Sequence, residues 1–129
     1  MPNKKHAKEW LEKAQHNLQA AKILFDADHF TDVIGIELHQ AIEKILKAIP
    51  AYYNNKINRI HDLALLLKES EKFVDIKPSY FNLCEIATDY YSTERYPLFQ
   101  HNLPPKEEIK KVMNMANDLY IAVVNLIER

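Results

Sequence analysis

The 129-residue sequence has very little glycine and cysteine, and both shortages narrow the possible fold classes. It contains one glycine, whereas a domain built from β-hairpins would normally use several in its turns. Its one cysteine, Cys84, cannot form a disulfide within the chain, and no charged-then-apolar signal segment opens the sequence. We therefore expect a helical protein that resides in a reducing cytoplasm.

Long apolar runs and an excess of one charge are also missing. No apolar run is long enough to cross a bilayer, so we expect no membrane contact. The 17 lysines and arginines nearly balance the 18 acidic residues, so no broad positive field can hold nucleic acid by counterion release alone. Any RNA contact is therefore expected to be local. A chain of this length, 47% hydrophobic, suffices for one core, and we expect a single domain over residues 1–129.

The sequence does contain strong helical periodicity. Apolar residues recur every three or four positions in five segments, each with one apolar face. The predicted helices cover residues 5–27, 31–49 (closed by Pro50), 61–70, 79 to just before Arg95, and 104–127. This pattern predicts an all-α fold, an antiparallel up-and-down four-helix bundle with an additional short helix. Gly35, inside the second helix, is expected to permit close packing of another helix.

Several segments, taken in order, resemble one known family. Residues 39–48 read HQAIEKILKA and resemble that family's Gln-Ala, Glu-Lys and Leu-Lys-Ala pattern; residues 61–63 read HDL, and residues 95–97 read RYP. Together they are similar to the HEPN family, a compact helical bundle associated with nucleotides and RNA. Each segment also has an ordinary structural interpretation. Glu43 and Lys47 have the spacing of an exposed helix pair, and His61 and Asp62 could simply begin a helix.

The resemblance also implies a possible chemistry. Many HEPN proteins are metal-independent ribonucleases in which four to six residues separate an arginine from a histidine, and five separate Arg95 from His101. Cleavage of RNA by its own 2′-hydroxyl needs a proton-exchanging group and a fixed cation beside the phosphate, roles that His101 and Arg95 would take. Tyr96, however, stands where catalytic members usually carry a small polar residue. The sequence Arg95-Tyr96-Pro97 resembles a branch of the family that is associated with minimal nucleotidyltransferases and often lacks the histidine. Whether the protein is an enzyme therefore stays open.

The candidate contacts to nucleotide or RNA are Arg95, Tyr96, Tyr91, Lys44 and His39. Aromatic side chains beside an arginine can stack on a base, but they could equally belong to the core or to a dimer interface. Arg95 could instead form a structural ion pair with Glu85 or with Glu94 of the partner subunit.

A metal site is not expected from the sequence. His39 and Glu43 lie one helical turn apart, but a zinc site needs three or four ligands and no third is evident. We therefore expect neither a metal nor another cofactor. Cys84 lies on an apolar stripe, which favours a buried small hydrophobic residue over a nucleophile.

The resemblance implies a homodimeric HEPN-domain protein that interacts with nucleotide or RNA. It further implies a small nucleotidyltransferase as partner, in a two-component module of the toxin–antitoxin type. The sequence is also compatible with two alternatives: a metal-independent endoribonuclease that uses Arg95 and His101, and a non-catalytic dimerisation module.

Overall fold

The computed structural model describes residues 2–95 and 103–129, except for the side chains of residues 92–95. The described residues form helices and connecting segments, with no strand among them. The helices are α1 (Lys4–Asp26), α2 (Thr31–Tyr52), α3 (Leu63–Ser70), α4 (Ser79–Arg95) and α5 (Lys106–Glu128). The prediction of an all-α fold is therefore confirmed.

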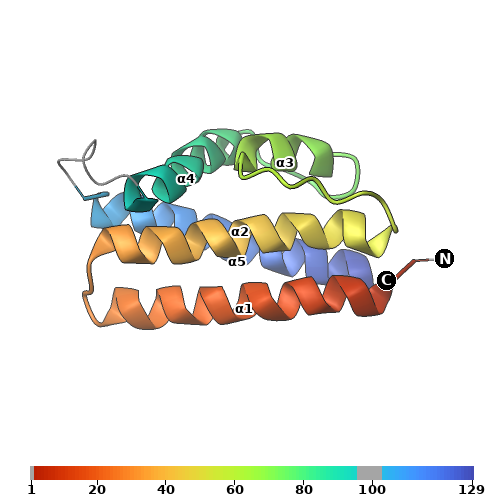
Figure 1. The fold of residues 1–129 in the computed structure, drawn as a ribbon, viewed down its shortest axis with the longest axis horizontal. Helices are drawn as coiled ribbons and strands as arrows, with labels where there is room; N and C mark the ends of the chain where they lie inside the picture. The colour runs from red at the N-terminus through yellow and green to blue at the C-terminus, as the bar shows by residue number, and fades with distance from the viewer. Residues whose placement is uncertain (1, 96–102) are drawn as a thin grey trace.

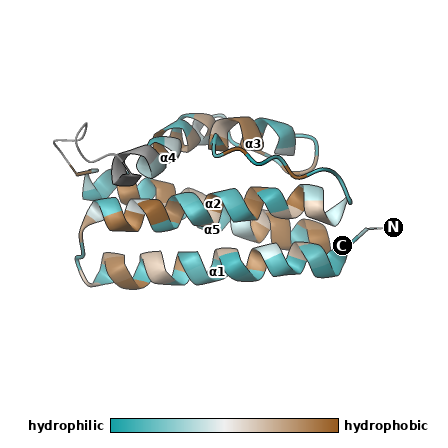
Figure 2. Cartoon of the chain, viewed as in Figure 1, coloured by the Kyte–Doolittle hydropathy of each residue, from teal (hydrophilic) through white to brown (hydrophobic). Residues whose placement is uncertain are grey.

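Four long helices run in alternating directions, and the short α3 lies over the C-terminal half of α2 (Figure 1). The central helix, α2, contacts each of the other four. Buried apolar residues from all five helices join in one cluster. Bands of hydrophobic and hydrophilic residues alternate along α1 and α2, as expected of helices that bury one face (Figure 2). Within the described residues, no helix is both long enough and apolar enough to span a membrane.

Gly35 allows α4 to approach α2 closely, as predicted. A Cβ atom at this position would lie 3.0 Å from Cγ of Tyr90, closer than side chains normally pack. The Tyr90 ring is buried, and its hydroxyl donates a 2.6 Å hydrogen bond to Glu108 of α5. The glycine therefore makes room for a side chain that connects α2, α4 and α5.

The ends of two helices differ from the predictions. Pro50 does not close α2, which continues to Tyr52. Proline lacks one donor, but its φ angle suits a helix, and the Tyr53 amide still bonds to the Ile49 carbonyl at 3.2 Å. Helix α4 includes Arg95 rather than ending before it. The steric restriction imposed by Pro97 falls on the residue directly before it, so it leaves Arg95 free to be helical.

Cys84 is fully buried on α4, as predicted. Burial raises the pKa of its thiol to about 12, which keeps it protonated near neutral pH. Cys84 therefore behaves as a small hydrophobic residue of the core.

Candidate functional site

Three polar side chains are buried along one face of α2. His39, Glu43 and Lys47 follow at intervals of four residues and are 0%, 5% and 7% exposed. Lys47 Nζ lies 3.2 Å from Glu43 Oε2, so the two charges form a buried ion pair. The expectation that this pair is exposed is wrong, because α3 and α4 both pack against α2. Groups buried in this way need polar partners, and neighbouring elements supply one each to His39 and Glu43.

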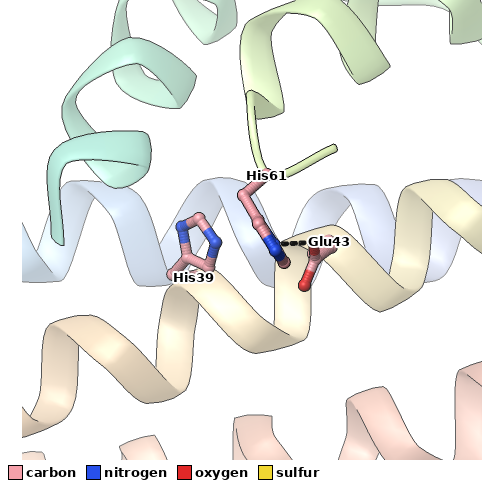
Figure 3. Close-up of side chains that lie close together, drawn as sticks. All are labelled: His39, Glu43 and His61. Atoms are coloured by element: carbon pink, nitrogen blue, oxygen red, sulfur yellow. Dashed lines mark hydrogen bonds and ion pairs between the residues drawn. The ribbon is translucent and has the colours of Figure 1, made fainter. Parts of the chain in front are cut away.

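His61 reaches the same face of α2 from the segment that precedes α3 (Figure 3). Its Nδ1 atom lies 2.6 Å from Glu43 Oε2. Two hydrogen bonds fix the start of α3 beside it: the Asp62 carboxylate accepts from the Leu65 amide at 3.2 Å, and the Leu63 amide donates to Thr88 Oγ1 at 3.0 Å. The His-Asp-Leu sequence thus begins α3 and also delivers an imidazole to the buried carboxylate of α2.

The ring of His39 has a fixed orientation. Its Nδ1 lies 2.9 Å from the carbonyl oxygen of Ala87 and must donate, because a carbonyl only accepts. Burial lowers the pKa of His39, so the neutral ring is favoured near pH 7. In that form, Nε2 carries a lone pair. Among the residues described, Nε2 of His39 is the one buried side-chain nitrogen or oxygen that lacks a hydrogen-bond partner.

Tyr91 of α4 packs against both histidines. Its ring centroid lies 4.7 Å from that of His61 and 5.1 Å from that of His39, and the ring planes meet at 14° and 30°. The structure therefore brings together two of the predicted contact residues, Tyr91 and His39. It adds His61, which was not among them.

The other predicted site residues are not joined to this cluster. Lys44 lies on the α1 side of α2, where its Nζ donates to Asn17 Oδ1 at 2.7 Å, and partial burial lowers the pKa of this lysine. Arg95 is the last residue of α4, one helical turn after Tyr91, but its side chain is outside the described part, as are the ion pairs considered for it. Tyr96 and His101 lie outside the described residues altogether.

His39, Glu43 and His61 have the composition of a metal-ligand set. Each offers one ligand atom, and these atoms all lie within 4.8 Å of one another. The third residue beside His39 and Glu43, which was not evident in the sequence, is His61. His61 is distant in sequence and comes close only because α3 folds back over α2, so helical spacing alone could not reveal it.

A polar pocket of about 340 Å³ lies next to the cluster, between the end of α2, the segment that follows and α3. Its charged lining residues are Lys47, Lys56, Lys72 and Glu69, and its neutral polar ones are Asn55, Asn58 and Ser70. Lys47 belongs to both the pocket and the buried ion pair. Sequence reasoning missed this site because Lys56 and Lys72 lie in irregular segments, where no periodic spacing relates them.

A second groove, of about 460 Å³, runs between α1 and α5. Its lining includes Leu18, Ile23, Met113 and Tyr120, and Lys22 is the one lysine among the described residues that line it. The larger groove is therefore less suited to an anionic ligand than the lysine-lined pocket.

Comparison with known proteins agrees with this architecture. The structure is similar to that of TT1696 from Thermus thermophilus, with a TM-score of 0.78 at 22% identity, covering 94% of this chain and 98% of that one. It is also similar to that of ST0689, an archaeal HEPN homologue, with a TM-score of 0.72 at 17% identity, covering 95% and 98%. At these identities, the similarity concerns the fold alone. No curated protein matches the sequence. The HEPN domain family matches residues 7–126, nearly the whole chain, and the protein belongs to that family.

Proposed function

We propose that this HEPN-domain protein binds a nucleotide, free or as part of a short RNA, in the pocket lined by Lys47, Lys56 and Lys72. The observation that carries the proposal is that three lysines line about 340 Å³ of space; Lys47 is already paired with Glu43, so Lys56 and Lys72 supply the positive charge that is unpaired among the described residues. This volume is near the lower end of the range for small-molecule sites, roughly 300–1,000 Å³, and suits a single nucleotide. Lysines bind phosphate as point charges.

The neutral polar lining supports the same ligand class. Asn55 and Asn58 can donate to and accept from the hydrogen-bonding edge of a base or the hydroxyls of a sugar. The one carboxylate of the lining, Glu69, opposes a phosphate, and it accepts a 2.7 Å hydrogen bond from Asn58 Nδ2. Because the whole chain carries a formal charge of −1, attraction for a phosphate must come from such a local cluster.

The binding proposal is tested by titrating a ribose-labelled fluorescent ATP analogue and a labelled single-stranded RNA in EDTA, followed by fluorescence anisotropy. The double variant Lys56→Ala/Lys72→Ala should weaken binding by about tenfold or more, equivalent to about 1.4 kcal/mol. The matched control is Lys110→Ala/Lys111→Ala, which removes the same charge from exposed positions on α5. Absence of binding by the wild type, or an equal loss in both variants, would refute the assignment of the pocket.

The same reactions, analysed on a denaturing gel, test the endoribonuclease alternative. No described geometry favours it, since the Arg95 side chain and His101 are outside the described part. RNA cleavage in EDTA that disappears in both Arg95→Ala and His101→Ala would replace the binding proposal with a nuclease. If the RNA remains intact, the proposal of nucleotide binding without cleavage stands.

We also propose that the protein forms a homodimer and works with a small nucleotidyltransferase in a module of the toxin–antitoxin type. Membership of the HEPN family and the Arg95-Tyr96-Pro97 sequence support it. Light scattering after size exclusion should give twice the chain mass of 15.2 kDa, and affinity purification from the native host should recover the nucleotidyltransferase. A monomer, or a purification that recovers no such protein, would contradict the corresponding part of the proposal.

A further inference from the structure

We propose that His39, Glu43 and His61 form a binding site for a transition-metal ion, with Zn²⁺ as the ion that fits best. Two imidazoles and one carboxylate are a donor set that zinc accepts, with a fourth position left for water. Calcium and magnesium favour sites made of oxygen ligands and are less suited to two imidazoles. The site differs from the nucleotide pocket, although Lys47 touches both.

The positions of the three side chains are close to those required. Ligand atoms on a tetrahedral zinc stand about 3.3 Å apart, given zinc–nitrogen distances of about 2.0–2.1 Å. The three ligand atoms here already lie within 4.8 Å of one another. His39 and Glu43 are held one turn apart on α2, whereas the His61 side chain is 51% exposed and precedes α3. The exposure of His61 leaves it room to adjust and leaves a path for the ion and for a water ligand.

The orientation of His39 is a second observation that points to a metal, and it is independent of the distances between the ligand atoms. Its Nδ1–H donates to the Ala87 carbonyl, and its buried Nε2 has no hydrogen-bond partner. A histidine that binds a metal through one nitrogen commonly donates its other N–H to a backbone carbonyl or a carboxylate, which fixes the ring and its tautomer. A buried nitrogen without a partner costs free energy in the metal-free protein, and a zinc ion would remove that cost.

Proton and charge balance permit zinc to enter. His61 Nδ1 now donates to Glu43 Oε2, so zinc must take the place of that proton. The proton moves to Nε2 of the same ring or, from a charged ring, leaves to solvent. His61 and Lys47 both bond to Oε2 of Glu43, so zinc would either share Oε2 with Lys47 or bind Oε1 of the same carboxylate. The ammonium group of Lys47 repels the ion, but it also holds the carboxylate in place, as partners of metal-bound carboxylates commonly do.

The test uses tag-free protein stripped with EDTA and then dialysed, with Zn²⁺ alone as the probe and no nucleotide present. Calorimetry should give one zinc per chain, and Co²⁺ should produce the visible absorption bands of a tetrahedral site. His61→Ala removes a half-exposed ligand and should leave the fold intact. Loss of an outer partner of a metal ligand typically costs 10–100-fold in affinity, so loss of His61 itself should weaken binding by about 100-fold.

Two further variants make the result specific. Glu43→Gln, which keeps the shape of the side chain, should also weaken zinc binding by at least about tenfold. The matched control is His16→Ala, which removes an exposed histidine of α1 and should leave the affinity unchanged. Absence of stoichiometric binding, or zinc binding that survives His61→Ala, would overturn the proposal. Since no nucleotide is used, neither outcome depends on the proposed function.

Discussion

At the scale of single residues, two tyrosine hydroxyls tie α4 to α5. Tyr80 donates a 2.6 Å hydrogen bond to Asp118, and Tyr90 donates one of equal length to Glu108. Burial, together with the bond to Asp118, raises the pKa of Tyr80 to about 12, and the corresponding causes raise the pKa of Tyr90. Both bonds require the phenol to keep its proton, which makes them sensitive to alkaline pH.

The Tyr80 bond predicts a specific loss of stability in alkali. Above pH 10, the unfolded tyrosine loses its proton while the folded one keeps it, so the free energy of unfolding falls between about pH 10 and about pH 12. Urea unfolding across this range should give a steeper decline for the wild type than for Tyr80→Phe. At neutral pH the variant should be less stable by about 1 kcal/mol. Parallel pH profiles for the two proteins would contradict this assignment.

The close packing at Gly35 predicts that replacing this helical glycine lowers the stability of the protein, the reverse of the usual effect. Glycine to alanine normally stabilises a helix by up to about 1 kcal/mol. Here the new Cβ would meet the Tyr90 ring at 3.0 Å, and overpacking of this kind costs about 1–3 kcal/mol. Gly35→Ala should therefore lower the free energy of unfolding by about 1 kcal/mol, measured in urea. In a Tyr90→Ala background, the same change should be neutral or stabilising; destabilisation in both backgrounds would contradict the steric explanation.

The environment of a residue was predictable only where helical periodicity describes its neighbours. The core residues Cys84 and Gly35 could be placed because each sits at a definite position on one helix, whereas two contacts of the candidate site could not. The buried pair Glu43 and Lys47 looked exposed, since a spacing of four residues is the same whether or not α3 covers it. The bond from His61 to Glu43 depends on the path of a connecting segment, which has no periodic signal.

At the scale of helices, α3 is anchored by α4 rather than by its own eight residues. Thr88 Oγ1 donates to the Cys84 carbonyl at 2.8 Å and accepts from the amide of Leu63, a residue that is fully buried. The hydroxyl therefore joins two elements and sets the position of His61 two residues earlier. The five helices themselves were predictable from their apolar faces, whereas this joining contact was not.

Thr88→Val tests the anchor, because valine keeps the shape of the side chain and removes the hydroxyl. The Leu63 amide would then be buried without a partner, at a cost of about 1–3 kcal/mol. Chemical unfolding should show that loss, and amide exchange at Leu63 should accelerate. Thr88→Ser retains the hydroxyl and should stay within about 0.5 kcal/mol of the wild type. Equal stability of the valine and serine variants would mean that the hydroxyl does not anchor α3.

At the scale of the whole molecule, the near balance of charge limits how nucleic acid could bind. With a formal charge of −1, the protein offers phosphate local groups of lysines rather than a broad positive surface. For single strands, the logarithm of the binding constant falls against the logarithm of salt concentration with a slope of about −0.7 per phosphate contacted. Two or three contacts in the pocket therefore predict a slope of roughly −2 in RNA titrations. A slope steeper than about −5 would require a much larger surface.

The most direct test of the account is to locate the bound nucleotide by NMR. A ¹⁵N-labelled sample should be titrated with ATP in EDTA, which keeps the proposed zinc site out of the measurement. Binding in the lysine-lined pocket predicts shifts concentrated at the amides around Lys47, Lys56 and Lys72, with little change along the α1–α5 groove near Met113. Shifts confined to that groove, or no shifts at saturating ATP, would contradict the assignment of the lysine-lined pocket as the nucleotide site.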